Sequence, residues 1–158
     1  MTNVVLPLLM LCTAQTNLIS NPDFDNGLTN WTSVGLTASV QAQYQGRANV
    51  VLLEQGVEYA CLYQDVGQAA SPGEIYEARV SAWSESVTLG LGLIPLIVFL
   101  DDSGTQLGWD GPNLGIDREW TEMRFQANAP AGTTKVRLQL MLHEPGTTAA
   151  VDSARLFK

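Results

Sequence analysis

The chain has 158 residues, a length that suits one domain with a hydrophobic core of its own. Hydrophobic residues make up 46% of it and charged residues 15%, a balance typical of a folded domain and not of a disordered one. The formal net charge of −8 argues against nucleic acid and against an anionic membrane surface as partners, because both need a basic surface. Solubility is the ordinary reason for such acidity, and a cation site or a basic partner are the alternatives.

The first sixteen residues contain an apolar run, VVLPLLML, at positions 4–11. No Lys or Arg precedes it as in a secretory signal, and it is too short for a membrane span and interrupted by Pro7. We therefore expect residues 1–16 to form an extended arm that docks on a neighbouring chain, with folding back onto its own domain as the alternative. The expected docking residues are Val4, Val5, Leu6, Leu8, Leu9, Met10 and Leu11.

The two cysteines, Cys12 and Cys61, leave the redox compartment open. Cys61 lies in an apolar strand pattern, which predicts a small buried hydrophobic side chain. Sequence alone gives no distance between the two sulfurs, so a disulfide between them is neither predicted nor excluded.

From residue 17 onward, short β-rich runs alternate with turn signals such as Gln45-Gly46 and Pro145-Gly146, and no helical stripe of useful length appears. This organisation is typical of an all-β sandwich or barrel. We assign residues 17–158 to one such domain. The predicted strands are 37–43, 48–54, 59–66, 74–85, 93–101, 120–127, 134–143 and 149–157.

Three of these runs alternate apolar and polar residues, as expected for a sheet with one wet face. The side chains predicted to face inward are Tyr76, Ala78, Val80, Ala82, Met123, Phe125, Val136, Leu138, Leu140 and Leu142. The side chains predicted to face outward are Glu77, Arg79, Ser81, Trp83, Glu85, Trp120, Glu122, Arg124, Gln126, Lys135, Arg137, Gln139, Met141 and His143.

The run 91–100, LGLIPLIVFL, is apolar at both parities. Either the domain itself covers both faces of this strand, or one face meets another subunit. Pro95 predicts an edge strand or a bulge, because proline cannot donate to a strand ladder.

Several segments, taken in order, resemble carbohydrate-binding modules of the family 4, 9 and 22 type. The segment 17–31, NLISNPDFDNGLTNW, resembles their first strand and turn. Segments 62–66 and 73–76 resemble their central strand pair, and 120–125, 129–132 and 136–140 their late strands. The ending 151–157, VDSARLF, resembles their closing strand. The resemblance covers residues 17–157 and implies a jelly-roll β-sandwich of two antiparallel sheets.

The resemblance also implies a structural calcium near the chain ends. Asp25 matches the acid after the phenylalanine, and Asp152 the acid of the closing strand. Calcium prefers several hard oxygen ligands. The alternative is local: Asp25 caps the turn at Asn26-Gly27, and Asp152 accepts a nearby backbone donor.

No residue pattern predicts catalysis. His143 is the only histidine and has no nucleophile motif beside it, and Asp101-Asp102 precede a turn at Ser103-Gly104. Zinc, phosphate-loop and dinucleotide patterns are missing from the sequence. We therefore expect a non-enzymatic protein that requires no cofactor.

A glycan would need exposed aromatic rings with polar neighbours. Trp83 with Arg79 on one strand, and Arg137, Gln139 and His143 on a neighbouring strand, are predicted to share such a face. For Trp83, packing in a subunit interface is preferred over a role as a glycan platform. Tyr63 and Trp109 are weaker candidates, and Trp31 and Trp120 are expected in core or edge packing.

Domains of this resemblance also occur on phage virions. Together with the apolar arm, this favours a phage capsid decoration (cement) protein as the first hypothesis. Its expected partners are the major capsid protein and like subunits in a homotrimer on the capsid exterior, with cell-surface glycan as a further contact. The alternative is a secreted carbohydrate-binding module, which cleavage near Ala14 would support.

Overall fold

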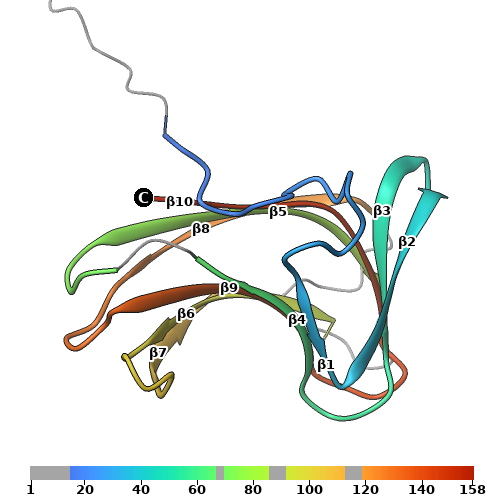
Figure 1. The fold of residues 1–158 in the computed structure, drawn as a ribbon. Helices are drawn as coiled ribbons and strands as arrows, with labels where there is room; N and C mark the ends of the chain where they lie inside the picture. The colour runs from blue at the N-terminus through green and yellow to red at the C-terminus, as the bar shows by residue number, and fades with distance from the viewer. Residues whose placement is uncertain (1–14, 67–69, 86–91, 113–118) are drawn as a thin grey trace, which may run out of the picture.

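The computed structural model describes residues 15–66, 70–85, 92–112 and 119–158. The predicted docking arm, from Val4 to Leu11, lies outside these residues, as does Cys12. Within the described ranges the structure is all-β, and no helix there could cross a membrane. The predicted fold class, a sandwich of two antiparallel sheets, is confirmed (Figure 1).

Ten strands form two five-stranded sheets, and every pairing between neighbours is antiparallel. We name each sheet after its central strand. The β9 sheet has the order β1 (Thr32–Val34), β4 (Ala60–Asp65), β9 (Lys135–Leu142), β6 (Leu93–Leu100) and β7 (Gln106–Asp110). The β10 sheet has the order β2 (Leu36–Tyr44), β3 (Arg47–Gln55), β10 (Thr148–Phe157), β5 (Ile75–Glu85) and β8 (Thr121–Asn128).

Each of the eight predicted strands corresponds to an observed one, whereas β1 and β7 were not predicted. Both lie at the edge of the β9 sheet. β1 is three residues long and exposed throughout, and β7 carries Gly108 between exposed residues. Neither strand has a buried face, so neither shows the apolar alternation from which strands are recognised.

The two sheets face each other (Figure 1). The inward side chains of both sheets form the hydrophobic core between them. The residues of β5 and β9 that were predicted to face inward do so: each strand contributes four of them, and all are at most 1% exposed. Met123 on β8 is buried as well. Phe125 is only half-buried and packs on the margin of the core. Burial of alternate side chains thus fixes the register of both sheets, because a one-residue slip would turn these side chains outward.

The opening segment ties the two sheets together. The backbone N–H of Leu18 donates to the carbonyl of Leu156 on β10 over 2.7 Å, beyond the point where β3 stops pairing with that strand. Ser20 exchanges two hydrogen bonds with the buried amide of Gln64 on β4, over 2.7 and 2.9 Å. One short segment therefore contacts a strand of each sheet.

The turn that follows is built around Asn21. Its side-chain oxygen accepts from the backbone of Asn26 over 3.1 Å, and its carbonyl accepts from the indole N–H of Trp31 over 3.2 Å. Phe24 and Trp31 are buried, with ring centroids 5.2 Å apart. The expectation that Trp31 packs in the core is confirmed.

Strand β6 is covered on both sides within the single chain. Leu93, Ile97 and Phe99 face the main core, and the opposite side carries a second buried apolar group that includes Met141 of β9. The outward residues of β6, which are 2–7% exposed, are Ile94, Leu96, Val98 and Leu100. The alternative of coverage within the domain therefore holds, and this strand offers no open apolar face to a second subunit.

The edge-strand prediction from Pro95 is wrong, because β6 lies between β9 and β7. Pairing with β7 covers only Ile97–Leu100, so the proline lies where that ladder has already ended. Gly111 passes beside it so closely that a Cβ on Gly111 would lie 2.0 Å from the Pro95 carbonyl oxygen. The missing N–H of Pro95 therefore costs no ladder bond to β7, and the chain can pass this close to its carbonyl only because Gly111 has no Cβ.

Candidate functional site

The predicted glycan face is divided between the two sheets. Strand β5, with Arg79 and Trp83, belongs to the β10 sheet, whereas β9, with Arg137, Gln139 and His143, belongs to the β9 sheet. Their outward side chains therefore lie on opposite faces of the sandwich, and the prediction of one shared face is wrong. Side-chain parity shows which residues of a strand share a side, but it does not show which sheet the strand joins.

Trp83 is not an exposed platform. Its side chain is 4% exposed and packs with Val50 and Ala150, and Tyr44 lies edge-on to its ring with centroids 5.5 Å apart. The ring lies on the outer side of the β10 sheet but is covered by side chains of β2, β3 and β10. Trp83 is therefore neither a ligand platform nor a residue packed in a subunit interface, because its own chain covers the ring.

Arg79 belongs to a charged group around Glu77. Glu77 was expected to face solvent, but it is only 3% exposed. Its carboxylate accepts hydrogen bonds from Arg79 (2.6 Å), Arg124 (2.7 Å) and Gln126 (3.0 Å). Burial pushes the pKa of Glu77 upward, but the bonds from the two guanidiniums and the amide outweigh it and leave this pKa below its ordinary value.

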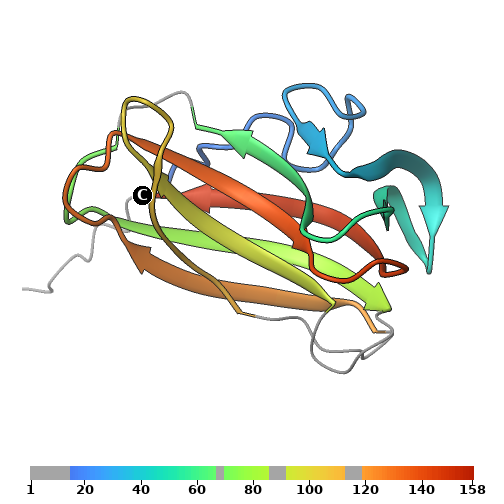
Figure 2. The same cartoon turned by 90° about the horizontal axis from the view of Figure 1, so that it is seen from below.

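Figure 2 looks onto the outer side of the β9 sheet. An aromatic and polar group of side chains lies on this side, at one end of β9. The Arg137 guanidinium lies over the Tyr63 ring, 3.7 Å from its centroid, and donates two hydrogen bonds to Asp65 over 2.6 and 3.1 Å. Partial burial would lower the pKa of Arg137, but the Asp65 carboxylate raises it overall, so this side chain stays charged. These contacts hold the stacked pair together, and Arg137 covers one face of the Tyr63 ring.

Gln139 is the neighbour of this group along β9. It lies directly opposite Tyr63 on β4 and Leu96 on β6, and it is half-buried. Its side-chain amide has no hydrogen-bond partner among the described residues. It therefore presents free donors and a free acceptor at the middle of the sheet.

The outward side chains from Arg137 to His143 form a strip along β9. His143 and Tyr59 lie at the end of this strip opposite to Arg137, just beyond β9 and β4. Their rings meet edge-on, with centroids 4.9 Å apart, and the Tyr59 side chain is 59% exposed. The Nδ1 atom of His143 is buried and has no hydrogen-bond partner within the described residues. From Arg137 to His143 the strip runs for about 20 Å, at roughly 3.4 Å per residue.

A second exposed aromatic residue flanks the strip on the far side. Trp109 on β7 pairs with Val98, which pairs in turn with Arg137, so Trp109 lies on the same outer face. The Trp109 side chain is 58% exposed. Three strand spacings of about 4.8 Å separate β7 from β4, so Trp109 and the Tyr63 group lie on either side of a face about 14 Å wide.

We name this surface the β9 face. The sequence identified Arg137, Gln139 and His143 on it, with Tyr63 and Trp109 as weaker candidates. It missed Tyr59 and Asp65, which lie at the ends of β4 and carry no motif. Cys61, opposite Met141, is buried as predicted, and this burial raises the pKa of its thiol.

The two acids predicted to bind calcium each have a local partner. Asp25 accepts a hydrogen bond from the Asn49 amide over 3.1 Å, and Asp152 pairs with Arg47 over 3.1 Å. Neither partner is the turn or backbone donor considered as the local alternative. In the part of the chain that the structure describes, no three His, Cys, Asp or Glu side chains are grouped to hold a metal. Calcium binding thus stays a prediction without support from this arrangement.

Asp101 serves the turn that follows β6. Its carboxylate accepts from the Ser103 hydroxyl over 2.6 Å and from the Thr105 backbone over 2.8 Å. The bond from the Ser103 hydroxyl contributes most, and together these bonds hold the pKa of Asp101 below its ordinary value. The interpretation of this segment as a turn is confirmed.

Comparison with known proteins gives a family and a set of similar structures. A family model described as a carbohydrate binding domain matches residues 16–149. No curated protein matches the chain.

Three solved structures illustrate the likeness. The CBM22-1 xylan-binding domain from Paenibacillus barcinonensis Xyn10C is 15% identical, with a TM-score of 0.66 over 91% of this chain and 95% of that chain. A family 16 carbohydrate binding module is 20% identical, with a TM-score of 0.66 over 90% and 100%. The enzymatically active domain of tailspike protein 4 from bacteriophage CBA120 is 17% identical, with a TM-score of 0.68 over 89% of this chain and 21% of that chain.

The chain thus spans about a fifth of the tailspike chain but nearly all of the two binding modules. At these identities the solved structures show a shared fold. The family match extends over most of the chain. The protein therefore belongs to the carbohydrate binding domain family.

Proposed function

We propose that the protein is a non-catalytic glycan-binding module and that its ligand lies along the β9 face. The observation that carries the proposal is the free amide of Gln139, placed beside Tyr63 and between two exposed aromatic side chains, Tyr59 and Trp109. Sugars pack on aromatic rings, while amides and charged groups hydrogen-bond their hydroxyls.

The shape of the face favours a chain of sugars over a single one. Its aromatic and polar side chains are spread over about 20 Å of β9, further than one ring extends. One end of the face is held in place before any ligand arrives, since Arg137 is fixed by Asp65 and by Tyr63. Preorganised side chains reduce the entropic cost of binding. Because one of the similar structures is a xylan-binding domain, xylan is a reasonable first polysaccharide to test.

The first test is affinity electrophoresis against a panel of soluble polysaccharides that includes xylan, followed by calorimetry with the best oligosaccharide. Tyr63→Ala and Gln139→Ala are each expected to weaken binding about tenfold or more, the equivalent of roughly 1.4 kcal/mol. Gln43→Ala, an exposed glutamine on β2 of the other sheet, is the matched control and should bind as the parent does. Unchanged affinity in both β9-face variants would refute this site.

A virion role is the second candidate. It is supported by the occurrence of the same fold within a bacteriophage tailspike protein. The features that would distinguish a capsid cement protein are the docking arm, the homotrimer and the contact with the major capsid protein. The arm lies outside the described residues, so these features stay predictions.

A further inference from the structure

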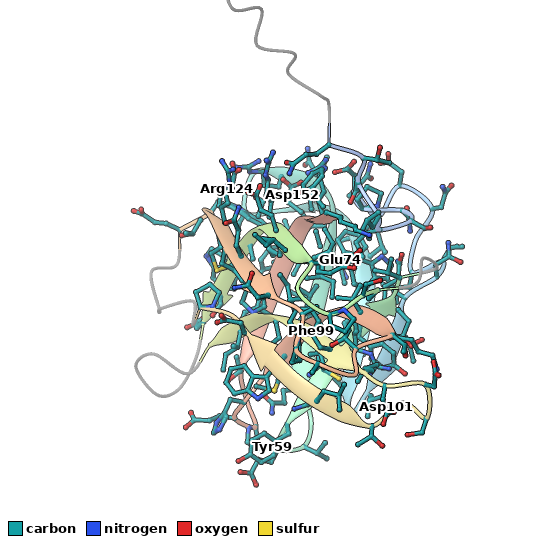
Figure 3. All side chains as sticks on the ribbon, turned by 90° about the vertical axis from the view of Figure 1, so that its left-hand side faces the viewer. Tyr59, Glu74, Phe99, Asp101, Arg124 and Asp152 are labelled. Carbon is teal, nitrogen blue, oxygen red and sulfur yellow. The ribbon has the colours of Figure 1, made fainter. Side chains whose placement is uncertain are left out.

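The outer face of the β10 sheet carries a hollow that the proposed glycan site does not use. Its volume is about 680 Å³, within the usual range for small-molecule sites. Figure 3 shows Asp152, which lines the hollow, and Arg124 on the side of the molecule opposite to Tyr59. The hollow and the β9 face are therefore separate surfaces.

Three arginines stand in one row across this sheet. Arg155 on β10 is the cross-strand partner of Arg79 on β5, which is in turn the partner of Arg124 on β8. Like charges directly opposite each other destabilise a sheet unless anions compensate them. The chain has only 8 Lys and Arg residues and a net charge of −8, so this row is an unusual concentration of positive charge.

Two carboxylates neutralise part of the row from its sides. Glu77 is shared by Arg79 and Arg124, and Asp23 pairs with Arg155. Within the row itself one positive charge is left over, while the carboxylate of Glu122, which also lines the hollow, lies in the next row. Asp23 takes only one of the five N–H donors of Arg155, so the guanidinium retains donors for a further acceptor.

The next row along the strands supplies hydroxyl and carboxylate groups. Ser153 on β10 pairs with Ser81 on β5, and Ser81 pairs with Glu122 on β8; all three line the hollow. Neither serine hydroxyl has a hydrogen-bond partner within the described residues. The row is thus suited to hold the hydroxyl groups of a ligand, each of which can both donate and accept.

A bulge in β10 brings these groups into place. The register of β10 against β5 shifts between Val151 and Ser153, so Asp152 is the extra residue. Asp152 and Ser153 consequently both line the hollow instead of alternating. At the wall, Arg47 pairs with Asp152 and lies 5.3 Å from the centroid of the Trp120 ring.

We infer that this hollow is a second, independent binding site for an acidic saccharide, whose carboxylate lies on Arg79 and Arg155 and whose hydroxyls lie on the serine row. A neutral sugar would offer no charged acceptor to the N–H donors of Arg155 that Asp23 leaves free. A small inorganic anion would not reach the hydroxyls of Ser81 and Ser153, which would then have no hydrogen-bond partner in the ligand. The site does not depend on the β9 face, so either can be wrong while the other is right.

The test is a titration of ¹⁵N-labelled protein, followed by NMR, with digalacturonic acid, with the neutral digalactose of the same linkage and with sodium sulfate. Digalacturonic acid is expected to shift the amide signals of Ser81, Ser153 and Arg155, and its affinity should fall as salt is added. The neutral dimer should bind at least tenfold more weakly, because it cannot form charge-assisted bonds. Equal binding of both dimers, or shifts with sulfate alone, would overturn the inference.

Variants separate this site from the other surface. Arg155→Gln is expected to weaken digalacturonic acid about tenfold or more. Lys135→Gln removes the same charge on the opposite sheet and should leave that affinity within twofold. Ser153→Leu fills the hollow without a change of charge and should abolish binding, which guards against an effect of Arg155 on folding. Tyr63→Ala should have no effect here, and parental binding by both hollow variants would contradict the site.

Discussion

Some side chains at outward positions of this sandwich are buried by their neighbours on adjacent strands. Glu77 is the clearest example: it lies at an outward position of β5, yet it is buried by the two guanidiniums and the amide that bind it. A buried carboxylate is tolerated only where such partners satisfy it. Arg79 also lies 4.6 Å over the ring of Phe157, so Glu77 fixes a cation that packs on an aromatic ring.

Glu77→Gln is expected to lower the free energy of unfolding at pH 7 by about 1–3 kcal/mol, the usual contribution of bonds to a charged group. The pKa of Glu77 is lowered in the folded state. Its contribution is therefore fully present above the unfolded value of about 4.5 and is lost as the pH falls through the folded pKa. The difference between parent and variant should accordingly shrink at pH 3. Urea denaturation at both pH values measures it.

The control for this measurement is Glu122→Gln, an exposed glutamate on the neighbouring strand with no partner among the described residues. It should change stability by less than about 0.5 kcal/mol. If the Glu77 variant were as stable as the parent at pH 7, or if the loss were the same at pH 3, the bonds to this carboxylate would not contribute as described.

At the scale of elements, the opening turn and strand β10 meet where the resemblance implied calcium. The Arg47 guanidinium from β3 already neutralises Asp152, and Asn49 at a positive φ of 54° bonds Asp25. A cation that is part of the protein thus stands at one of the two carboxylates expected to hold the metal. The described arrangement favours local partners over a metal site with several oxygen ligands.

We therefore expect calcium to have little effect on stability. Addition of excess EDTA, and then of millimolar calcium, should move the thermal midpoint by less than about 1 °C, because a ligand that does not bind the native state cannot stabilise it. Differential scanning calorimetry is the measurement, with magnesium as the control ion. A rise of several degrees with calcium alone, lost in Asp152→Asn, would instead establish the metal site.

At the scale of the whole molecule, the sandwich offers two chemically different outer faces. The β9 face combines exposed aromatic side chains with a free amide, whereas the β10 sheet carries the arginine row and its hollow. Because the sheets are separated by the buried core, ligands on the two faces would not touch each other. Such a module could connect two different saccharides, and each face can be altered without the other.

The predicted arm concerns assembly, which is also a property of the whole molecule. Full-length protein and a variant lacking residues 1–12 should be compared by size-exclusion chromatography with light scattering. The docking hypothesis predicts a trimer for the full chain and a monomer for the shortened one, since the apolar run would be the contact between subunits. Identical masses would contradict a docking role for the arm and leave glycan binding as the function to pursue.

Much of the fold could be predicted from alternation and turn signals. The inward residues of β5 and β9 were identified because alternate apolar side chains have only one stable location, the space between two sheets. The edge strands β1 and β7 were missed because they bury no face of their own. The outward side of Trp83 was predicted, but its burial was not, because its cover comes from Tyr44 and Val50, residues of other strands that no local pattern connects to it.

The sequence by itself determined the all-β class, the positions of eight of the ten strands and much of the core, because each depends on local periodicity and on the hydrophobic effect. Only the tertiary structure decided which strands share a sheet. That arrangement separates Trp83 from Gln139, aligns the three arginines in one row and buries Glu77. Those features depend on cross-strand neighbours. Neighbours of this kind are far apart in the chain, and the order of strands within each sheet brings them together.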